Sequence, residues 1–168
     1  WEAVYFDHDL DRLLDLAQRA ADLGVERFVL DDGWFGARRN DYAGLGDWVV
    51  SQDAWPNGLG PLVDAVTGLG MQFGLWFEPE MVNADSDVAR AHPEWVMSAR
   101  PSEGVAGWPI EARHQQVLNL AIPECYTYIR DQIDALLSEY AIPYIKWDHN
   151  RDLVEPGSQP DDGRPIVH

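Results

Sequence analysis

The carboxylate of Asp148 stands where an apolar segment gives way to a loop. Tyr144–Ile145 begins that segment, Lys146 lies two residues before the carboxylate, and Asn150 two residues after it. In barrel enzymes the residues at the carboxyl ends of strands carry the chemistry. An aspartate after a strand is also a common turn or cap residue, and Lys146 could be its surface partner. Asp148 alone therefore leaves both interpretations open.

Two other strand ends carry carboxylate and tryptophan together. Asp31–Trp34 follows the apolar segment Phe28–Leu30, and Trp76–Glu78 closes the next such strand. If the strands run parallel, these side chains share one rim with Trp1, and such a pocket suits a sugar, because carboxylates and amides pair with hydroxyls while a pyranose face packs on indole. The chain has 8 tryptophans, of which roughly half suit plain core packing.

Glycoside hydrolysis uses a pair of carboxyl groups, and a retaining enzyme holds an ionised nucleophile and a protonated acid about 5 Å apart. Asp148 is the stronger nucleophile candidate, because Lys146 on the same strand face would keep a neighbouring carboxylate ionised. Asp31 and Asp32 are adjacent and point to opposite sides of an extended backbone, which suits hydroxyl binding better than an acid and nucleophile pair.

Other charged residues have two interpretations each. Glu78 precedes Pro79 and fits a loop anchor as well as a ligand. Arg113 on sequence alone is more often a surface or structural ion-pair residue than a substrate contact. His8 and His149 have aspartate neighbours, but consecutive positions diverge in a strand or turn, so we expect no metal site.

Composition narrows the class of partner. Twelve basic residues against 29 acidic ones give a net charge of −17, which repels phosphate backbones and anionic lipid, so neither nucleic acid nor membrane is expected as a partner. A hydrophobic fraction of 46% excludes a disordered tail. Cys125 is the one cysteine, no leader-like segment opens the chain, and no apolar run could span a bilayer. We expect a cytoplasmic protein.

The spacing of apolar residues predicts an α/β fold in which strands alternate with helices. Strands are expected over 1–6, 27–30, 71–77 and 142–147, with a small one at 117–120, and helices over 10–21, 61–69, 87–91 and 123–140. Asp9 should cap the first helix and Gly24 end it. No glycine-rich phosphate turn follows the first strand, and the long loops all follow strands.

This pattern fits about four parallel strands with their helices, roughly the first half of a TIM (β/α)₈ barrel that needs about 250 residues when complete. Residues 1–150 would form the N-terminal half of a barrel catalytic domain, and residues 151–168 a truncated loop after the nucleophile strand. The chain begins at Trp1 without a methionine and ends in a turn-rich stretch, so it reads as a slice of a longer protein.

Six ordered motifs make the chain resemble glycoside hydrolase family 36, the α-galactosidases or melibiases. The similarity runs from the first residue to about Asn150. The motifs are Trp1–Ala3, Asp31–Gly36, Gly46–Trp48, Pro56–Leu59, Leu75–Met81 and Tyr144–Asn150.

The resemblance implies a retaining hydrolase that removes terminal α-galactosyl groups from melibiose, raffinose and related oligosaccharides. It implies that Asp148 is the catalytic nucleophile and that Asp31 and Asp32 bind the galactose hydroxyls far from the anomeric carbon. The further substrate-binding residues that it implies are Trp1, Trp76, Arg113, Lys146 and Asn150. No cofactor is expected, and the family suggests a homo-oligomer, commonly a tetramer.

The resemblance also indicates what lies beyond these residues. The family's general acid/base is an aspartate on a later strand, after His168, and its cysteine-containing galactose loop also follows the nucleophile strand, so Cys125 is a different cysteine. The β-sandwich domain that usually precedes the barrel is missing. The isolated chain is therefore expected to be inactive. Three alternatives stay open: an α-N-acetylgalactosaminidase, a transglycosidase of the raffinose-synthase type, and a non-catalytic sugar-binding fragment.

Overall fold

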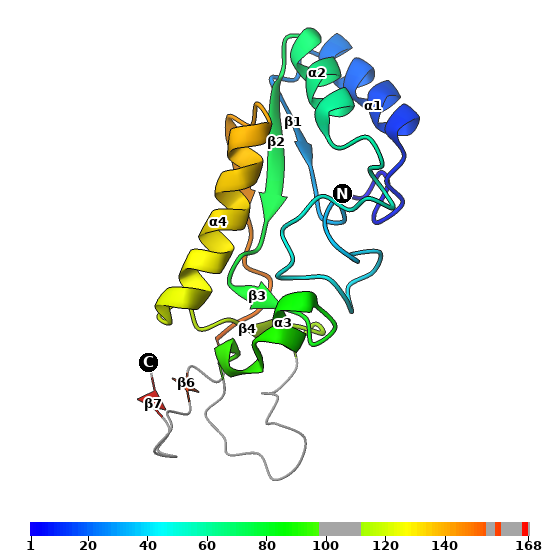
Figure 1. Ribbon diagram of the computed structural model, residues 1–168. Helices are drawn as coiled ribbons and strands as arrows, with labels where there is room; N and C mark the ends of the chain where they lie inside the picture. Colours follow the sequence, from blue (N-terminus) through cyan, green and yellow to red (C-terminus); the bar gives the residue numbers. More distant parts are fainter. Residues whose placement is uncertain (98–111, 154–156, 159–165, 168) are drawn as a thin grey trace. The chain divides into compact units, whose positions relative to one another are not determined.

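The computed structural model describes residues 1–97, 112–153, 157–158 and 166–167 (Figure 1). The chain divides into two compact units. Unit 1 comprises Trp1–Asn40, Trp48–Phe77 and Gln132–Asp148, and unit 2 comprises Asp41–Asp47, Glu78–Asp131 and His149–His168. Among the described residues, no helix combines the length and the apolar character needed to cross a membrane.

A three-stranded parallel sheet forms the framework of unit 1. Its strands are β1 (Arg27–Leu30), β2 (Gln72–Phe77) and β5 (Tyr144–Trp147), in the order β1-β2-β5. Leu75 in the central strand is opposite Leu30 on one side and Ile145 on the other. Because all three strands run in the same direction, the residues that follow β1 and β5 leave the sheet at one edge. The α/β class with parallel strands is therefore confirmed.

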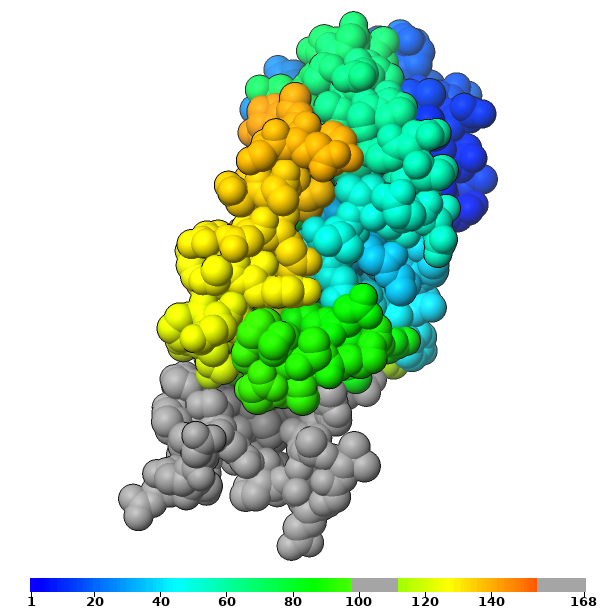
Figure 2. Space-filling model, in the orientation of Figure 1, coloured from blue at the N-terminus to red at the C-terminus, as the bar shows by residue number. Residues whose placement is uncertain are grey.

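Helices begin and end close to the predicted positions. α1 (Leu10–Asp22) starts at Asp9, whose side chain accepts a hydrogen bond from the Arg12 backbone N–H, and Gly24 follows its end with a positive φ of 78°. α2 (Gly60–Gly68) packs against α1, and Figure 2 shows the two helices adjoining on one face. The last turns of α4 (Pro123–Glu139) also belong to unit 1.

The predicted strand over Trp1–Phe6 is wrong, so the parallel sheet of the described residues has three strands rather than about four. The segment forms consecutive turns, in which the backbone N–H groups of Val4 and Tyr5 both donate to the carbonyl of Trp1. Tyr5 has a φ of 48°, outside the extended region that a strand requires. The Trp1 ring packs edge-on against the rings of Tyr5 and Phe6, an arrangement that holds the turn closed.

Aromatic rings fill the centre of unit 1. Trp34, Phe35, Trp48 and Phe77 are completely buried, and Trp76 is almost so. The ring centroids of Phe35 and Trp48 lie 4.5 Å apart, and those of Trp34 and Phe77 lie 5.4 Å apart. Most of the described tryptophans therefore serve the core, more than the half expected from composition.

Unit 2 contains shorter elements. β3 (Met81–Val82) and β4 (Gln116–Val117) form an antiparallel pair, and α3 (Asp87–Ala91) and the 3₁₀ turn η1 (Pro93–Trp95) come between them along the chain. The helix predicted over 87–91 is thus found, whereas the small strand expected at 117–120 ends at Val117. Of residues 151–168, β6 (Gly157–Ser158) and β7 (Ile166–Val167) form a second antiparallel pair.

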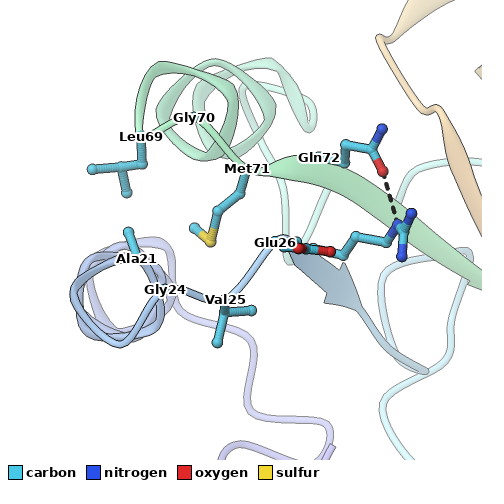
Figure 3. Close-up of a pocket in the computed structure, with 9 residues that line it drawn as sticks. Ala21, Gly24, Val25, Glu26, Leu69, Gly70, Met71 and Gln72 are labelled. Carbon is cyan, nitrogen blue, oxygen red and sulfur yellow. Dashed lines mark hydrogen bonds between the residues drawn. The ribbon is translucent and has the colours of Figure 1, made fainter.

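A surface hollow lies at the amino ends of β1 and β2 (Figure 3). The ends of α1 and α2 border it through Ala21 and Leu69, and Met71 contributes its side chain. Its main polar contact is the 2.8 Å hydrogen bond from Arg27 to Gln72. The hollow is at the opposite end of these strands from Asp31 and Asp148, so it does not belong to the predicted site.

Candidate active site

The carboxyl ends of β1 and β5 lead directly into Asp31 and Asp148 in unit 1. Phe77 is paired with Trp147 in the sheet register, and the backbone N–H of Asp148 donates to the Phe77 carbonyl at 2.8 Å. This bond extends the ladder by one residue beyond β5. The Asp148 side chain therefore leaves the sheet from a backbone that is fixed in position.

Trp76 holds the Asp148 carboxylate directly. Its indole N–H donates to Oδ2 of Asp148 at 3.0 Å. The Trp76 ring is 2% exposed and stacks with Phe35 at an angle of 8° between the ring planes, while the Trp34 indole donates to the Trp76 carbonyl at 2.9 Å. A rigid donor aimed at one carboxylate oxygen restricts the rotation of that carboxylate.

Lys146 forms an ion pair with Asp31. Its Nζ lies 2.7 Å from Oδ2 of Asp31, across a sequence separation of 115 residues. The Asp31 side chain is 16% exposed and that of Lys146 43% exposed, so the pair is partly open to solvent. The sequence predicts that Lys146 keeps the nearby Asp148 carboxylate ionised, and the ion pair that Lys146 forms is with Asp31.

Asp32 points away from Lys146 and into a buried pair with Arg38. Nε of Arg38 lies 2.9 Å from Oδ1, and an Nη lies 2.8 Å from Oδ2. Burial raises the pKa of the Asp32 carboxyl, and the hydrogen bonds from Arg38 oppose that rise. The two neighbouring aspartates thus have different partners, Lys146 for Asp31 and Arg38 for Asp32.

His8 contacts the same turn from the N-terminal segment. Its Nε2 lies 3.0 Å from the Asp32 carbonyl oxygen, which can only accept, so Nε2 carries the proton. Burial and the charge of Arg39 lower the pKa of His8 to about 4. The ring is therefore neutral at physiological pH, and its interaction is a structural hydrogen bond.

Trp1 lies at the rim of unit 1 with 44% of its surface exposed. It lines the same hollow as Asp31, together with Tyr5, His8 and apolar residues of α1 and β1. The structure thus brings Trp1, Asp31, Lys146, Trp76 and Asp148 to the strand ends of one unit.

Unit 2 holds the two other predicted contacts, Arg113 and Asn150, around a buried carboxylate. Glu78 is fully buried and accepts from the backbone N–H of Asn150 and from Nε2 of Gln115 at 3.2 Å. Arg113 donates to the carbonyl of Asn150 at 3.4 Å. Glu78 is therefore a loop anchor, which decides between its two interpretations.

The turn that carries Arg113 has an unusual backbone. Arg113 and His114 have φ values of 53° and 60°, in the left-handed region that residues other than glycine rarely adopt. The flanking residues Ala112 and Gln115 bond to each other, and the Asn83 side chain donates to the His114 carbonyl at 2.7 Å. Consecutive positive φ angles outside glycine are costly and cluster at functional sites.

Metal and thiol chemistry find little support in the described part of the chain. In that part, no three His, Cys, Asp or Glu side chains come close enough together to hold an ion. Cys125 is buried, and desolvation raises the pKa of its thiol to about 12, so it is not a reactive thiolate.

Sequence reasoning missed the residues that hold the aspartates. Arg38 was not singled out, and His8 was considered only as a metal ligand. Adjacent arginines at 38 and 39, within a loop rich in glycine and aspartate and in a chain with 12 basic residues, were the available signal.

The sequence pattern of the Melibiase family matches residues 1–168. An α-galactosidase of Escherichia coli is 48% identical over 159 residues, which cover 95% of this chain and 22% of that protein. The crystal structure of AgaB, a GH36 α-galactosidase from Geobacillus stearothermophilus, matches with a TM-score of 0.86 and 44% identity, over 98% of this chain and 22% of that one.

A further relative, the GH36 α-galactosidase AgaA of Geobacillus stearothermophilus, was crystallised as variants with raffinose and with stachyose. These structures match with TM-scores of 0.85 and 0.84, each at 42% identity over 98% of this chain and 22% of theirs. These matches cover 95% to 98% of this chain and only 22% of the relatives' length. The chain therefore belongs to the Melibiase family.

Proposed function

We propose that the full-length protein carrying this chain is a retaining α-galactosidase that removes terminal α-D-galactosyl residues from oligosaccharides of the melibiose and raffinose type. One observation carries the proposal: a carboxylate at the end of a parallel strand, Asp148, is held by a buried indole donor beside the Lys146–Asp31 ion pair. The membership of the Melibiase family and the raffinose and stachyose complexes of a relative support the substrate class.

The proposed reaction is a double displacement. An oxygen of Asp148 attacks the anomeric carbon while a second, protonated carboxyl group gives its proton to the departing glycosidic oxygen. The same group then takes a proton from water, which attacks the galactosyl–enzyme ester and regenerates Asp148. Two inversions at one carbon retain its configuration. We propose that the second carboxyl group lies outside these 168 residues, in the other half of a TIM barrel.

The proposed galactose contacts keep their sequence-based roles. Asp31 and Asp32 would bind the hydroxyls far from the anomeric carbon, with one hydroxyl-accepting lone pair or more remaining on each carboxylate. Trp1, Trp76, Arg113, Lys146 and Asn150 complete the proposed set. A site built to bond one epimer leaves its polar groups unpaired with the other, so glucosides should be poor substrates.

Covalent trapping tests the nucleophile. A fluorinated galactosyl reagent that forms the ester but resists its hydrolysis should label the full-length protein at the peptide containing Asp148, as read by mass spectrometry. Asp148→Asn should abolish the label. A label on another residue would overturn the assignment.

A substrate panel separates the related activities within the family. Release of galactose from melibiose, well above that from an N-acetylgalactosaminide, supports the proposal. Preference for the N-acetylgalactosaminide would instead make the protein an N-acetylgalactosaminidase, and transfer of galactose from galactinol to sucrose would make it a transglycosidase. Sedimentation of the same preparation tests the homo-oligomer, commonly a tetramer, that the resemblance suggests.

A further inference from the structure

The carboxylate of Asp32 is held at both oxygens by one guanidinium. The two nitrogen–oxygen distances, 2.9 Å and 2.8 Å, describe a bidentate pair between Arg38 and Asp32. The Arg38 side chain is only 3% exposed and that of Asp32 12% exposed. Rotation of the carboxylate would break at least one of the two bonds, so this pair fixes the plane of the Asp32 carboxyl group.

A buried ion pair is a costly way to stabilise a fold. Removal of two charges from water offsets much of their attraction, and apolar residues of similar volume often stabilise a protein as well or better. Lys146 and Asp31, at the neighbouring position, form a pair that is partly open to solvent. The burial of the Arg38–Asp32 pair therefore calls for a role other than stability.

Two groups from the N-terminal turn hold the same pair in place. The guanidinium carbon of Arg38 lies 5.4 Å from the centre of the Phe6 ring, and His8 donates to the Asp32 carbonyl. The backbone N–H of Asp32 donates to Oδ1 of Asp31 at 2.9 Å. We call Phe6, His8 and Arg38 the Asp32 clamp.

Gly33 shows how closely the clamp fits the turn. Its φ is 109°, and a Cβ at this position would lie 3.1 Å from Nε2 of His8 and 3.2 Å from the Phe6 ring. Both the backbone conformation and the space favour glycine here. The turn and the clamp thus fix the backbone and the side chain of Asp32 together.

We propose that Arg38 is a positioning and specificity-determining residue, which orients Asp32 so that its carboxylate matches the hydroxyl arrangement of galactose. This inference rests on the proposed function. The two carboxylate oxygens have four lone pairs between them, of which Arg38 takes two and the backbone N–H of Gly33 one, so that one remains for a sugar hydroxyl. Because the plane is fixed, the remaining lone pair has a fixed direction, and an epimeric hydroxyl cannot meet it. Arg38 acts through Asp32 and does not touch the reacting atoms.

Steady-state kinetics of the full-length protein test the role. With a nitrophenyl α-galactoside, Arg38→Met should raise KM about tenfold or more while kcat changes less than about threefold, because substrate binding is lost rather than nucleophile chemistry. Arg38→Lys, which keeps the charge without the planar fork, should recover only part of that loss. The ratio of kcat/KM for the α-galactoside to that for the α-glucoside should fall in both variants.

A double-mutant cycle shows whether Arg38 acts through Asp32. Addition of Arg38→Met to Asp32→Asn should change KM by less than about twofold, because the carboxylate that Arg38 orients is already absent. Arg19→Met is the matched control, since it breaks an exposed pair with Asp15 of the same 2.8 Å length. This variant should keep the wild-type KM.

Several results would overturn the inference. A wild-type KM in Arg38→Met would overturn it. So would a rise in KM on adding Arg38→Met to Asp32→Asn that equals the rise in the wild-type background, because Arg38 would then not act through Asp32. A fall in kcat alone, with lowered thermal stability in both Arg38 variants, would make the residue merely structural. If the wild-type protein releases no galactose, the proposed function fails, and a crystal structure of Arg38→Met decides the inference: an Asp32 carboxylate in its original plane rejects it.

Discussion

At the scale of residues, the position of Asp148 depends on the indole of Trp76. Trp76→Phe keeps a buried aromatic ring and removes the indole N–H that donates to Asp148 at 3.0 Å. Loss of a hydrogen bond to a charged group should lower kcat by roughly tenfold to a hundredfold, with a smaller change in KM, because the nucleophile then samples other orientations. Steady-state assays on an α-galactoside would measure the separate effects on kcat and KM.

The matched control is Trp95→Phe, the same substitution at a buried tryptophan of unit 2 that stacks on His92. It should leave kcat unchanged. A rise in KM without a fall in kcat for Trp76→Phe would show that the indole contacts galactose without orienting Asp148.

His8 should give the protein a pH-dependent loss of stability. Its pKa is about 4 in the folded chain and 6.5 as the ordinary value, so between these limits the unfolded state binds more protons. The contribution of neutral His8 to the free energy of unfolding is complete above pH 6.5, and it falls by up to about 3 kcal/mol as the pH drops towards 4. Arg39 lowers this pKa further, whereas Asp31 opposes the shift.

Thermal unfolding of wild type and His8→Gln at several pH values isolates this effect. The glutamine can still donate to the Asp32 carbonyl but does not titrate. The Tm advantage of wild type should shrink from pH 7 to pH 4.5, since the other ionisable groups are shared by both proteins. A constant difference would contradict the prediction.

The candidate site was partly predictable from residue types. Carboxylates after apolar strands identified Asp31 and Asp148, and the register of parallel strands brings their positions to one edge. The partners could not be predicted, because Arg38 reaches Asp32 only through the path of the loop after β1, and Trp76 reaches Asp148 across 72 residues. Loop conformation depends on tertiary packing, which local spacing does not encode.

At the scale of elements, β2 needs a glycine in the middle of the sheet. A Cβ on Gly74 would lie 2.9 Å from Cδ1 of Tyr144 and 3.0 Å from Cγ2 of Val29, on the two neighbouring strands. Gly74→Ala should therefore destabilise the protein by about 1–3 kcal/mol through overpacking. A calorimetric scan would measure the lowered Tm.

Gly68→Ala is the matched control. Gly68 lies in α2, and a Cβ there meets nothing within 4 Å. Alanine in a helix is favoured over glycine by about 0.5–1 kcal/mol, so this substitution should leave stability unchanged or raise it. Equal effects of the two substitutions would show that the close approach of the strands is not the cause.

Elements with a strong local signal were predicted well, and those held by distant contacts were not. The Asp9 cap and the helix at Asp87–Ala91 follow from local hydrogen bonding and residue preference. The apolar and aromatic residues of Trp1–Phe6 predicted a strand, but ring contacts and the positive φ of Tyr5 make it a turn. The aromatic residues of this segment pack against each other, and the Phe6 ring lies against the Arg38 guanidinium instead of joining a sheet.

At the scale of the whole molecule, the parallel sheet of unit 1, in the part of the chain that the structure describes, has unpaired edge strands and exposed side chains on β5. Among the described residues, β1 and β5 each pair on one side only, through β2. Tyr144 and Trp147 in β5 are 41% and 55% exposed, whereas parallel strands are ordinarily buried on both faces. These edges fit a sheet that continues in a longer protein, as a half barrel would.

The 168-residue chain by itself should therefore not hydrolyse α-galactosides. A retaining mechanism needs a protonated acid about 5 Å from the nucleophile. The two other carboxylates brought to the strand ends of unit 1 are already engaged by cations, since both oxygens of Asp32 accept from Arg38 and Oδ2 of Asp31 accepts from Lys146. Galactose release by the isolated chain should equal that of its Asp148→Asn variant, measured on melibiose with enough protein to detect slow turnover. Release well above this control would place the acid within these residues, and Asp31→Asn and Asp32→Asn would then identify which aspartate supplies the proton.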